Sequence, residues 1–263
     1  MKLLTINTHS LIEKDYDKKC EYFVDAISRI KPDIIAMQEV NQSKWAQAVD
    51  SNNFCGEFLL KADNHAIKIS KILEKCGLKY YYNWLGIKYG YKIFEEGLGI
   101  LSLTPIEEAD SFLLTKSDDI NNWKTRKAQI IKTAGLVICN VHMGWWEDED
   151  EPFSSQFDHL NNKLSEMNKD IFLMGDFNSP ADEKNKGYEK VISDGWFDTY
   201  TLAADKDDGF TVTSKIDGWK NNKEKRIDYI FTNRQISVKS SNVIFNEKNE
   251  KIISDHHGVI IEI

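Results

Sequence analysis

The sequence lacks the signatures of several large enzyme classes. Its four cysteines show no Cys-x-x-Cys pair and no regular spacing, so no zinc cluster is indicated. Neither a Gly-Lys-Ser phosphate loop nor a serine nucleophile elbow occurs. What these absences leave is chemistry by a metal ion together with acid and base side chains.

Long apolar runs and an excess of positive charge are also missing. No run approaches the ~20 residues that a membrane span needs, and the first residues have no signal-peptide layout. Acidic residues outnumber basic ones by 42 to 34, for a formal net charge of -8. A surface of that sign repels a polyphosphate backbone, and no Lys/Arg stripe offsets it. We therefore expect a cytoplasmic protein with no membrane partner, for which nucleic acid is an unfavourable ligand.

Hydrophobic periodicity predicts a strand, a helix and a second strand at the start of the chain. The first strand covers 3–6 and the second covers 33–39, a separation that suits a parallel crossover. The pattern recurs where a helix that begins at Pro152 leads into a strand at Ile171. The first helix is indicated by apolar residues at spacings of three and four, namely Cys20, Phe23, Ile27 and Ile30.

The remaining pattern predicts mostly strands. A second helix is expected over 65–76 with Cys76 facing inward, and a loop over 88–92. Two strand–helix–strand halves that face each other would form an α/β (α+β) sandwich of two sheets with helices outside, a single domain over 1–263. The further strands are expected over 79–87, 97–102, 106–114, 128–133, 136–142, 227–231, 236–245 and 259–263.

Polar residues follow several of these strands directly. Asp176 and Asn178 come two residues apart after a buried strand, a spacing that puts both side chains on one face. Together they suit orienting a water while holding a phosphoryl oxygen. Taken alone, an Asx turn is the better explanation, but other strand exits repeat the same design. Glu39 leaves another buried strand and is a hard oxygen donor suited to Mg²⁺; the alternative is a solvated loop residue.

Histidines and a buried carboxylate complete the pattern. Asp255 and His256 are adjacent before the last strand, and a neighbouring carboxylate favours the charged imidazolium, which can meet a phosphate. Asp228 lies between apolar neighbours, so a histidine partner is expected for it. His142 ends a core strand, where a lone histidine is more often structural than catalytic.

This ordered set of motifs resembles the endonuclease/exonuclease/phosphatase superfamily. The superfamily includes deoxyribonucleases, abasic-site endonucleases, sphingomyelinases and inositol-polyphosphate 5-phosphatases, and its expected fold is a four-layer α/β sandwich. The resemblance runs from residue 4 to residue 259. It is carried by Asn7, Gln38-Glu39, His142, Gly175-Asp176-Phe-Asn178, Arg226-Ile-Asp228-Tyr and Ser254-Asp255-His256.

The resemblance implies a metal site and a base. Glu39, with Asn7 nearby, would hold a catalytic Mg²⁺, for which Mn²⁺ is a possible substitute, and Asp255 would lie near the same ion. Asp176 would orient and deprotonate the attacking water, and Asn178 would contact the phosphoryl group.

The resemblance also implies residues that bind the phosphate. His256, oriented by Asp228, would bind the phosphate opposite the metal. His142, paired with Glu96, would stabilise the developing charge. Arg126 matches a position that contacts phosphate in the deoxyribonuclease branch.

Aromatic residues near the expected site bear on the substrate. Trp145 and Trp146 follow His142 and precede the acidic run 147–151, and stacking rings beside carboxylates suit a sugar. The alternative is that both tryptophans cap the core and that the acidic run serves the next helix dipole. A second aromatic stretch leading to the site contains Trp84, Tyr89 and Tyr91.

Several functions are compatible with one set of catalytic residues, because fold does not fix substrate. The stretches 7–10, 96–102 and 142–146 are similar to a bacterial subgroup that includes maltose 6'-phosphate phosphatase, which implies a phosphomonoesterase acting on a sugar phosphate. A DNA endonuclease, exonuclease or abasic-site repair nuclease is the alternative, and a sphingomyelinase-like phosphodiesterase is a weaker one. A binding protein without chemistry would lack metal or base residues, and here all are present.

Overall fold

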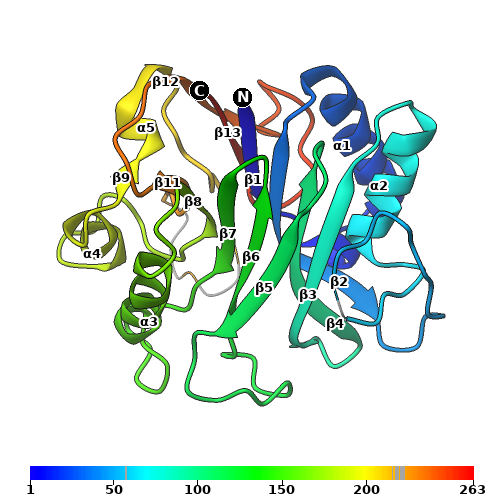
Figure 1. Cartoon of the computed structure of the whole chain (residues 1–263), viewed down its shortest axis with the longest axis horizontal. Helices are drawn as coiled ribbons and strands as arrows, with labels where there is room; N and C mark the ends of the chain where they lie inside the picture. Colours follow the sequence, from blue (N-terminus) through cyan, green and yellow to red (C-terminus); the bar gives the residue numbers. More distant parts are fainter. Residues whose placement is uncertain (57, 215, 217–218, 220–222) are drawn as a thin grey trace.

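Two mixed β-sheets pack face to face and carry helices on their outer faces (Figure 1). The computed structural model describes residues 1–56, 58–214, 216, 219 and 223–263. The seven-stranded sheet has the order β10 (Ala203–Lys206), β12 (Val238–Ile244), β13 (Gly258–Glu262), β1 (Lys2–Asn7), β2 (Ile34–Ser43), β4 (Phe94–Ser102) and β3 (Tyr81–Gly90). The six-stranded sheet has the order β5 (Glu108–Leu113), β6 (Lys127–Thr133), β7 (Leu136–His142), β8 (Ile171–Asp176), β11 (Asp228–Thr232) and β9 (Phe197–Asp198).

The layers are those of a four-layer sandwich, as predicted. Helices α1 (Tyr16–Ile30) and α2 (His65–Lys75) cover the seven-stranded sheet, and α3 (Phe153–Ser165) and α4 (Gly187–Ser193) cover the six-stranded sheet. One hydrophobic cluster lies under each helical layer, and a third joins the inner faces of the two sheets. Burial of these apolar faces is the main force that holds the layers together.

The first two helices form where periodicity predicts them, with one difference. In α1, Cys20, Phe23 and Ile27 are buried. The side chain of Asn64 caps α2 by accepting from two backbone N–H groups at 3.0 and 3.3 Å. The prediction that Cys76 faces inward is wrong, because α2 ends one residue earlier and Cys76 is an exposed C-cap residue.

Strand register brings the predicted strand exits to one edge of the sandwich. β1 and β2 are parallel, with Asn7 opposite Gln38. β7 and β8 are also parallel, with His142 opposite Asp176, and the antiparallel strand β11 places Asp228 opposite Asp176 from the other side. Residues far apart in the sequence therefore start from neighbouring backbone positions.

The strand ends at two hairpins, β6–β7 and β3–β4, can be compared with the sequence prediction. The predicted strands 128–133 and 136–142 form the hairpin of β6 and β7, whose turn has Ala134 and Gly135 both at positive φ. The predicted loop over 88–92 is wrong for its first part, because β3 continues to Gly90 and pairs with β4. A register shift between Gly86 and Lys88 interrupts the alternation there, so the sequence pattern ends the strand too early.

Several short elements have no strong sequence signal. They are the 3₁₀ helix η1 (Ser10–Ile12), α4, α5 (Thr199–Leu202), β9 and β10. Within the described ranges, no helix is long and apolar enough to cross a membrane.

A buried histidine makes stability depend on pH. His65, in the first turn of α2, is 5% exposed, and burial lowers its pKa to about 3. In the unfolded chain His65 binds a proton near pH 6.5, whereas in the folded chain it stays neutral down to a much lower pH. The free energy of unfolding therefore decreases by ~1.4 kcal/mol for each pH unit below about 6.5. We expect the wild type to lose about 2 kcal/mol more than His65→Gln between about pH 6.5 and about pH 5.

Urea denaturation at both pH values measures this difference. Equal losses in the two proteins would contradict it. His159→Gln, on the outer face of α3, is the matched control and is expected to behave as the wild type.

Candidate active site

A cavity of about 160 Å³ opens where the predicted strand exits meet. Two predicted residues lie directly behind its wall: Asn7 contacts Glu39 and Asp176, and Asp228 contacts His256. The predicted residues that line the cavity are Glu39, Glu96, Arg126, His142, Trp145, Asp176, Asn178, Asp255 and His256.

Glu39 reaches the cavity because β2 is irregular. The register of β2 shifts between Met37 and Val40, and Glu39 adopts a left-handed φ of 52°. Bulges of this kind turn a side chain out of the strand's alternation and are frequent next to active sites. The hydroxyl of Ser10 stabilises the bulge by donating to the Glu39 carbonyl at 2.7 Å.

The surroundings of Glu39 fit a divalent cation. The Asn7 amide donates to Glu39 Oε1 at 2.8 Å and to Asp176 Oδ2 at 3.1 Å. Burial and the nearby Glu96 carboxylate raise the pKa of Glu39, so its charge is under-compensated by the protein alone. Carboxylate oxygens of Glu39 and Asp255 and the amide oxygen of Asn7 are hard donors of the kind that Mg²⁺ and Mn²⁺ take. The Asn7 oxygen also accepts from the His9 backbone N–H at 3.2 Å.

Asp176 and Asn178 form an Asx turn that also faces the cavity. Asp176 Oδ1 accepts from the Asn178 backbone N–H at 2.8 Å, and Asn178 is left-handed with φ 47°. The turn and the site were alternatives in the sequence, and the structure contains both. Gly175 precedes them, and a Cβ there would lie 1.9 Å from the Val141 carbonyl oxygen, so only glycine fits.

The electrostatics of this cluster suit a proton acceptor. Burial and the Asp228 carboxylate raise the pKa of Asp176 to about 7. Its Oδ2 lies 3.6 Å from His142 Nε2 and 3.8 Å from His256 Nε2. A carboxylate with a pKa near neutrality is a competent general base at that pH.

The two histidines beside Asp176 carry different charges. Burial lowers the pKa of His256, but the carboxylates of Asp228 and Asp176 outweigh the effect of burial and raise this pKa to about 10. The two Asp228 oxygens lie 3.0 and 3.2 Å from His256 Nδ1. Burial, helped by Arg126 and Lys88, lowers the pKa of His142 well below its ordinary value. Near neutral pH, His256 is a cation and His142 is neutral.

Arg126 is a buried cation that no carboxylate of the described residues pairs with. The residue is 3% exposed, and its guanidinium donates to the carbonyls of Trp123 at 2.9 Å and Thr125 at 3.1 Å. Its Nε has no hydrogen-bond partner in the described part of the chain. The carboxylates of Glu96, Asp176 and Glu39 act on this charge without forming an ion pair with it among the described residues, so an anionic ligand next to the guanidinium would be favourable.

The predicted pairing of His142 with Glu96 is wrong. Glu96 lies opposite Lys88 in the β3–β4 register, and the Lys88 Nζ–Glu96 Oε1 distance is 3.2 Å. His142 instead faces Asp176. Lys88 escaped prediction because its segment was expected to be a loop, yet it lines the cavity and also donates to the Trp123 carbonyl at 2.8 Å.

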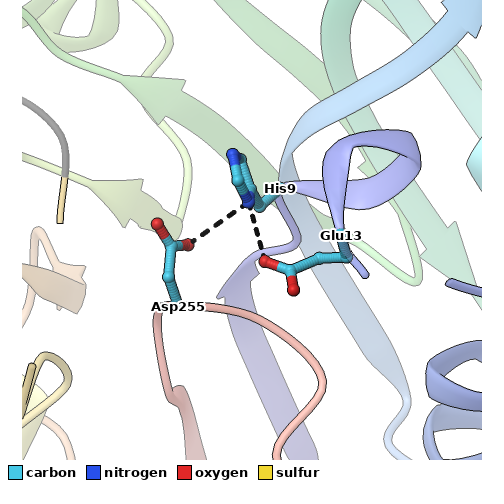
Figure 2. A group of neighbouring side chains, drawn as sticks. All are labelled: His9, Glu13 and Asp255. Carbon is cyan, nitrogen blue, oxygen red and sulfur yellow. Dashed lines mark hydrogen bonds and ion pairs between the residues drawn. The ribbon is translucent and has the colours of Figure 1, made fainter. Parts of the chain in front are cut away.

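A second group beside the cavity also escaped prediction, although His9 belongs to a stretch used for the resemblance. Figure 2 shows His9 Nδ1 pointing toward Glu13 at 2.7 Å and Asp255 at 3.9 Å, while the other ring nitrogen points away from both. Glu13 also pairs with Lys19. His9 and Lys19 balance the charge of Glu13, while His9, Glu13 and Asp255 also lie close enough together to hold a metal ion. Burial lowers the pKa of His9, but the hydrogen bond to Glu13 and the carboxylate of Asp255 outweigh burial and raise the pKa to about 9.

Of the tryptophans predicted near the site, one lines the cavity and two pack in the hydrophobic core. Trp145 lines the cavity, whereas Trp146 packs on the core with its ring centroid 6.1 Å from that of Phe153, so the core-packing alternative holds for Trp146. Trp84 is also a core residue, 2% exposed, because strand β3 directs it inward. Trp123 lines the cavity and had no sequence signal.

Comparison with known proteins agrees with this geometry. The sequence model of the Endonuclease/Exonuclease/phosphatase family matches residues 4–256. A family protein from Leptotrichia buccalis C-1013-b is 32% identical, with a TM-score of 0.88, over 100% of this chain and 98% of that one. No curated protein matches the sequence.

More distant structures share the fold. The mannosyl-6-phosphatase of Bacteroides thetaiotaomicron VPI-5482 is 18% identical, with a TM-score of 0.67, over 100% of this chain and 98% of that chain. Truncated TDP2 of Caenorhabditis elegans is 17% identical, with a TM-score of 0.66, over 99% of this chain and 95% of that chain. With its two-sheet sandwich and its cavity of carboxylates, histidines and a buried arginine, the chain belongs to the Endonuclease/Exonuclease/phosphatase family and is a phosphoric ester hydrolase.

Proposed function

We propose that the protein is a Mg²⁺-dependent phosphomonoesterase acting on a phosphorylated sugar such as maltose 6'-phosphate, with Mn²⁺ as a substitute cation. The observation that carries the proposal is the unpaired, buried Arg126 in the same cavity as Glu39 and Asp176. A phosphate ester supplies the anion that Arg126 lacks, and the carboxylates supply a cation site and a base beside it.

The charge distribution favours a terminal phosphate over a polyphosphate backbone. Lys88, Arg126 and His256 supply positive charge inside the cavity, while the chain as a whole carries a net charge of -8. A small phosphate dianion is attracted by the cations inside the cavity. A long nucleic-acid backbone would in addition be repelled by the net negative charge of the protein. The mannosyl-6-phosphatase that shares the fold acts on a substrate of the proposed class.

Glu39, Asn7 and Asp255 are the proposed ligands of the cation. When bound, the ion withdraws charge from the phosphoryl oxygens and so eases attack at phosphorus. Asn7 holds the Glu39 carboxylate in place through its 2.8 Å hydrogen bond.

Asp176 is the proposed base. It takes a proton from a water molecule as the water oxygen bonds to phosphorus and the bond from phosphorus to the sugar oxygen breaks. The departing sugar oxygen takes up a proton from solvent, so the products are the free sugar and inorganic phosphate. Asn178, Arg126 and His256 hold the phosphoryl group, and Asp228 keeps the His256 ring charged and oriented. His142 stabilises the developing charge by hydrogen bonding in its neutral form, and Glu96 acts by orienting Lys88.

The proposal extends to the organisation of the chain. We propose that residues 1–263 form one domain, because the site residues come from both sheets. We also propose a cytoplasmic location, with which four free thiols agree.

A substrate panel tests the proposed function. We expect phosphate release from maltose 6'-phosphate in Mg²⁺ to exceed cleavage of abasic-site DNA and of sphingomyelin, because the cavity offers cations to one terminal phosphate. Preferential cleavage of either of the other two would overturn the proposal. A nuclease would also lose activity steeply with added salt, which the sugar phosphatase does not.

Replacing the base tests the mechanism. Asp176→Asn keeps the volume and one hydrogen-bond acceptor but cannot take a proton, so kcat is expected to fall about 10²–10⁴-fold. The exposed Asp158→Asn is the matched control, with kcat unchanged. Steady-state kinetics with circular dichroism decides: full turnover in Asp176→Asn would remove it as the base.

Replacing a ligand tests the metal site. Glu39→Gln removes the charge that holds the cation, so the Mg²⁺ dissociation constant measured by calorimetry is expected to rise at least about tenfold. The exposed Glu166→Gln is the control and keeps the wild-type constant. Unchanged Mg²⁺ binding in Glu39→Gln would place the cation elsewhere.

A further inference from the structure

The rim of the cavity carries an indole that no catalytic step uses. Trp123 lines the cavity but is 52% exposed, and its ring centroid lies 5.5 Å from that of Trp145 at an interplanar angle of 55°. Leaving so large an apolar ring in water forfeits the stabilisation that burial would bring. The two indoles together form an aromatic corner at the mouth of the cavity.

The loop that carries Trp123 is held by the acidic run. Lys124 Nζ lies 2.9 Å from Asp148 and 2.6 Å from Asp150. The Glu151 carboxylate, in a residue 7% exposed, accepts from the backbone N–H groups of Lys116 and Ser117 at 2.9 to 3.1 Å. These carboxylates are occupied by the protein, so they clamp the two tryptophan loops together instead of binding sugar hydroxyls.

The backbone of Trp123 is also tied to the cations of the cavity. Its carbonyl oxygen accepts from Lys88 Nζ at 2.8 Å and from Arg126 Nη1 at 2.9 Å. The backbone of Trp123 is therefore held next to the Arg126 guanidinium, and its indole extends from that position over the mouth of the cavity. If the phosphate of an ester binds at Arg126, the alcohol part of that ester would lie next to the Trp123 indole.

Trp145 adds a polar requirement to the corner. Its Nε1 is buried and has no hydrogen-bond partner among the residues described. An unpaired buried donor is unfavourable, and an oxygen of the ligand would relieve this cost. An aromatic face with a nearby N–H donor suits a pyranose, which has an apolar C–H face and oxygens at its edge.

We propose that Trp123 determines specificity by holding the sugar ring of the substrate against the Trp123–Trp145 corner, next to the phosphate bound at Arg126. The inference rests on the proposed sugar-phosphatase function and goes beyond it by assigning the ring-binding surface. It commits the enzyme to phosphate esters in which a ring lies beside the phosphate, in preference to acyclic ones.

Kinetics of Trp123→Ala and Trp123→Phe on three phosphate esters tests the proposal. The esters are maltose 6'-phosphate, glucose 6-phosphate and the acyclic glycerol 1-phosphate. For Trp123→Ala we expect KM for both sugar esters to rise about tenfold, with kcat changed less than about twofold and glycerol 1-phosphate unaffected. Trp123→Phe keeps an aromatic face and is expected to restore KM to within about threefold of the wild type.

The control is Trp45→Ala, which removes an indole that is 77% exposed and does not line the cavity. It is expected to leave all three esters unaffected. A fall in kcat/KM of the same size on all three esters would overturn the proposal, since Trp123 would then act only by positioning Arg126 and Lys88. An unchanged KM for the sugar esters in Trp123→Ala would overturn it as well.

The same panel separates this inference from the function on which it rests. If the wild-type enzyme cleaves glycerol 1-phosphate better than both sugar esters, or cleaves neither sugar ester, the proposed function fails and the inference fails with it. If the wild type prefers the sugar esters while Trp123→Ala behaves as the wild type, only the inference fails.

Discussion

The amide of Asn7 joins the two sheets at the site. It donates to Glu39 in its own sheet and to Asp176 in the other, residues that lie 32 and 169 positions away in the sequence. Neither carboxylate could be placed against the other by its own strand, because each sheet fixes only its own register. The site therefore exists only where the sandwich is closed, and burial between the sheets supplies the free energy that holds it so.

Charge is the second constraint on the cavity. Its floor gathers carboxylates whose pKa values are raised and an arginine that lacks a counter-ion, an arrangement that is unfavourable when nothing is bound. A divalent cation and a phosphate ester would each offset one half of this imbalance. By contrast, the Glu13 carboxylate beside the cavity is balanced by His9 and Lys19, so these contacts orient His9 without calling for a ligand at Glu13.

Structural features that depend on a short stretch of sequence could be predicted, whereas features that depend on contacts between distant segments could not. Buried strands with polar exits are readable, so the floor of the site, including Asp176 and His256, was predicted from residue patterns and a resemblance. The bulge that turns Glu39 inward and the shift that hides Lys88 in β3 depend on pairing with another strand, which no local pattern reports. Trp123 lies in a loop fixed by contacts with a segment more than twenty residues away, and so it had no signal.

The same division separates chemistry from substrate choice. The floor is built from strand ends, whose positions follow from the fold, and a family that shares the fold shares that frame. The rim is built from the loops that carry Trp123 and Trp145. Its geometry depends on Lys124 and on the acidic run, for which the sequence suggested only sugar binding or a helix-dipole role. Asp148, Asp150 and Glu151 of that run contact the Trp123 loop and so are not free to bind a ligand, while the net negative charge would disfavour a polyanionic backbone. On the proposed role of Trp123, substrate selection depends on these loop contacts, and it could change while the catalytic floor stays the same.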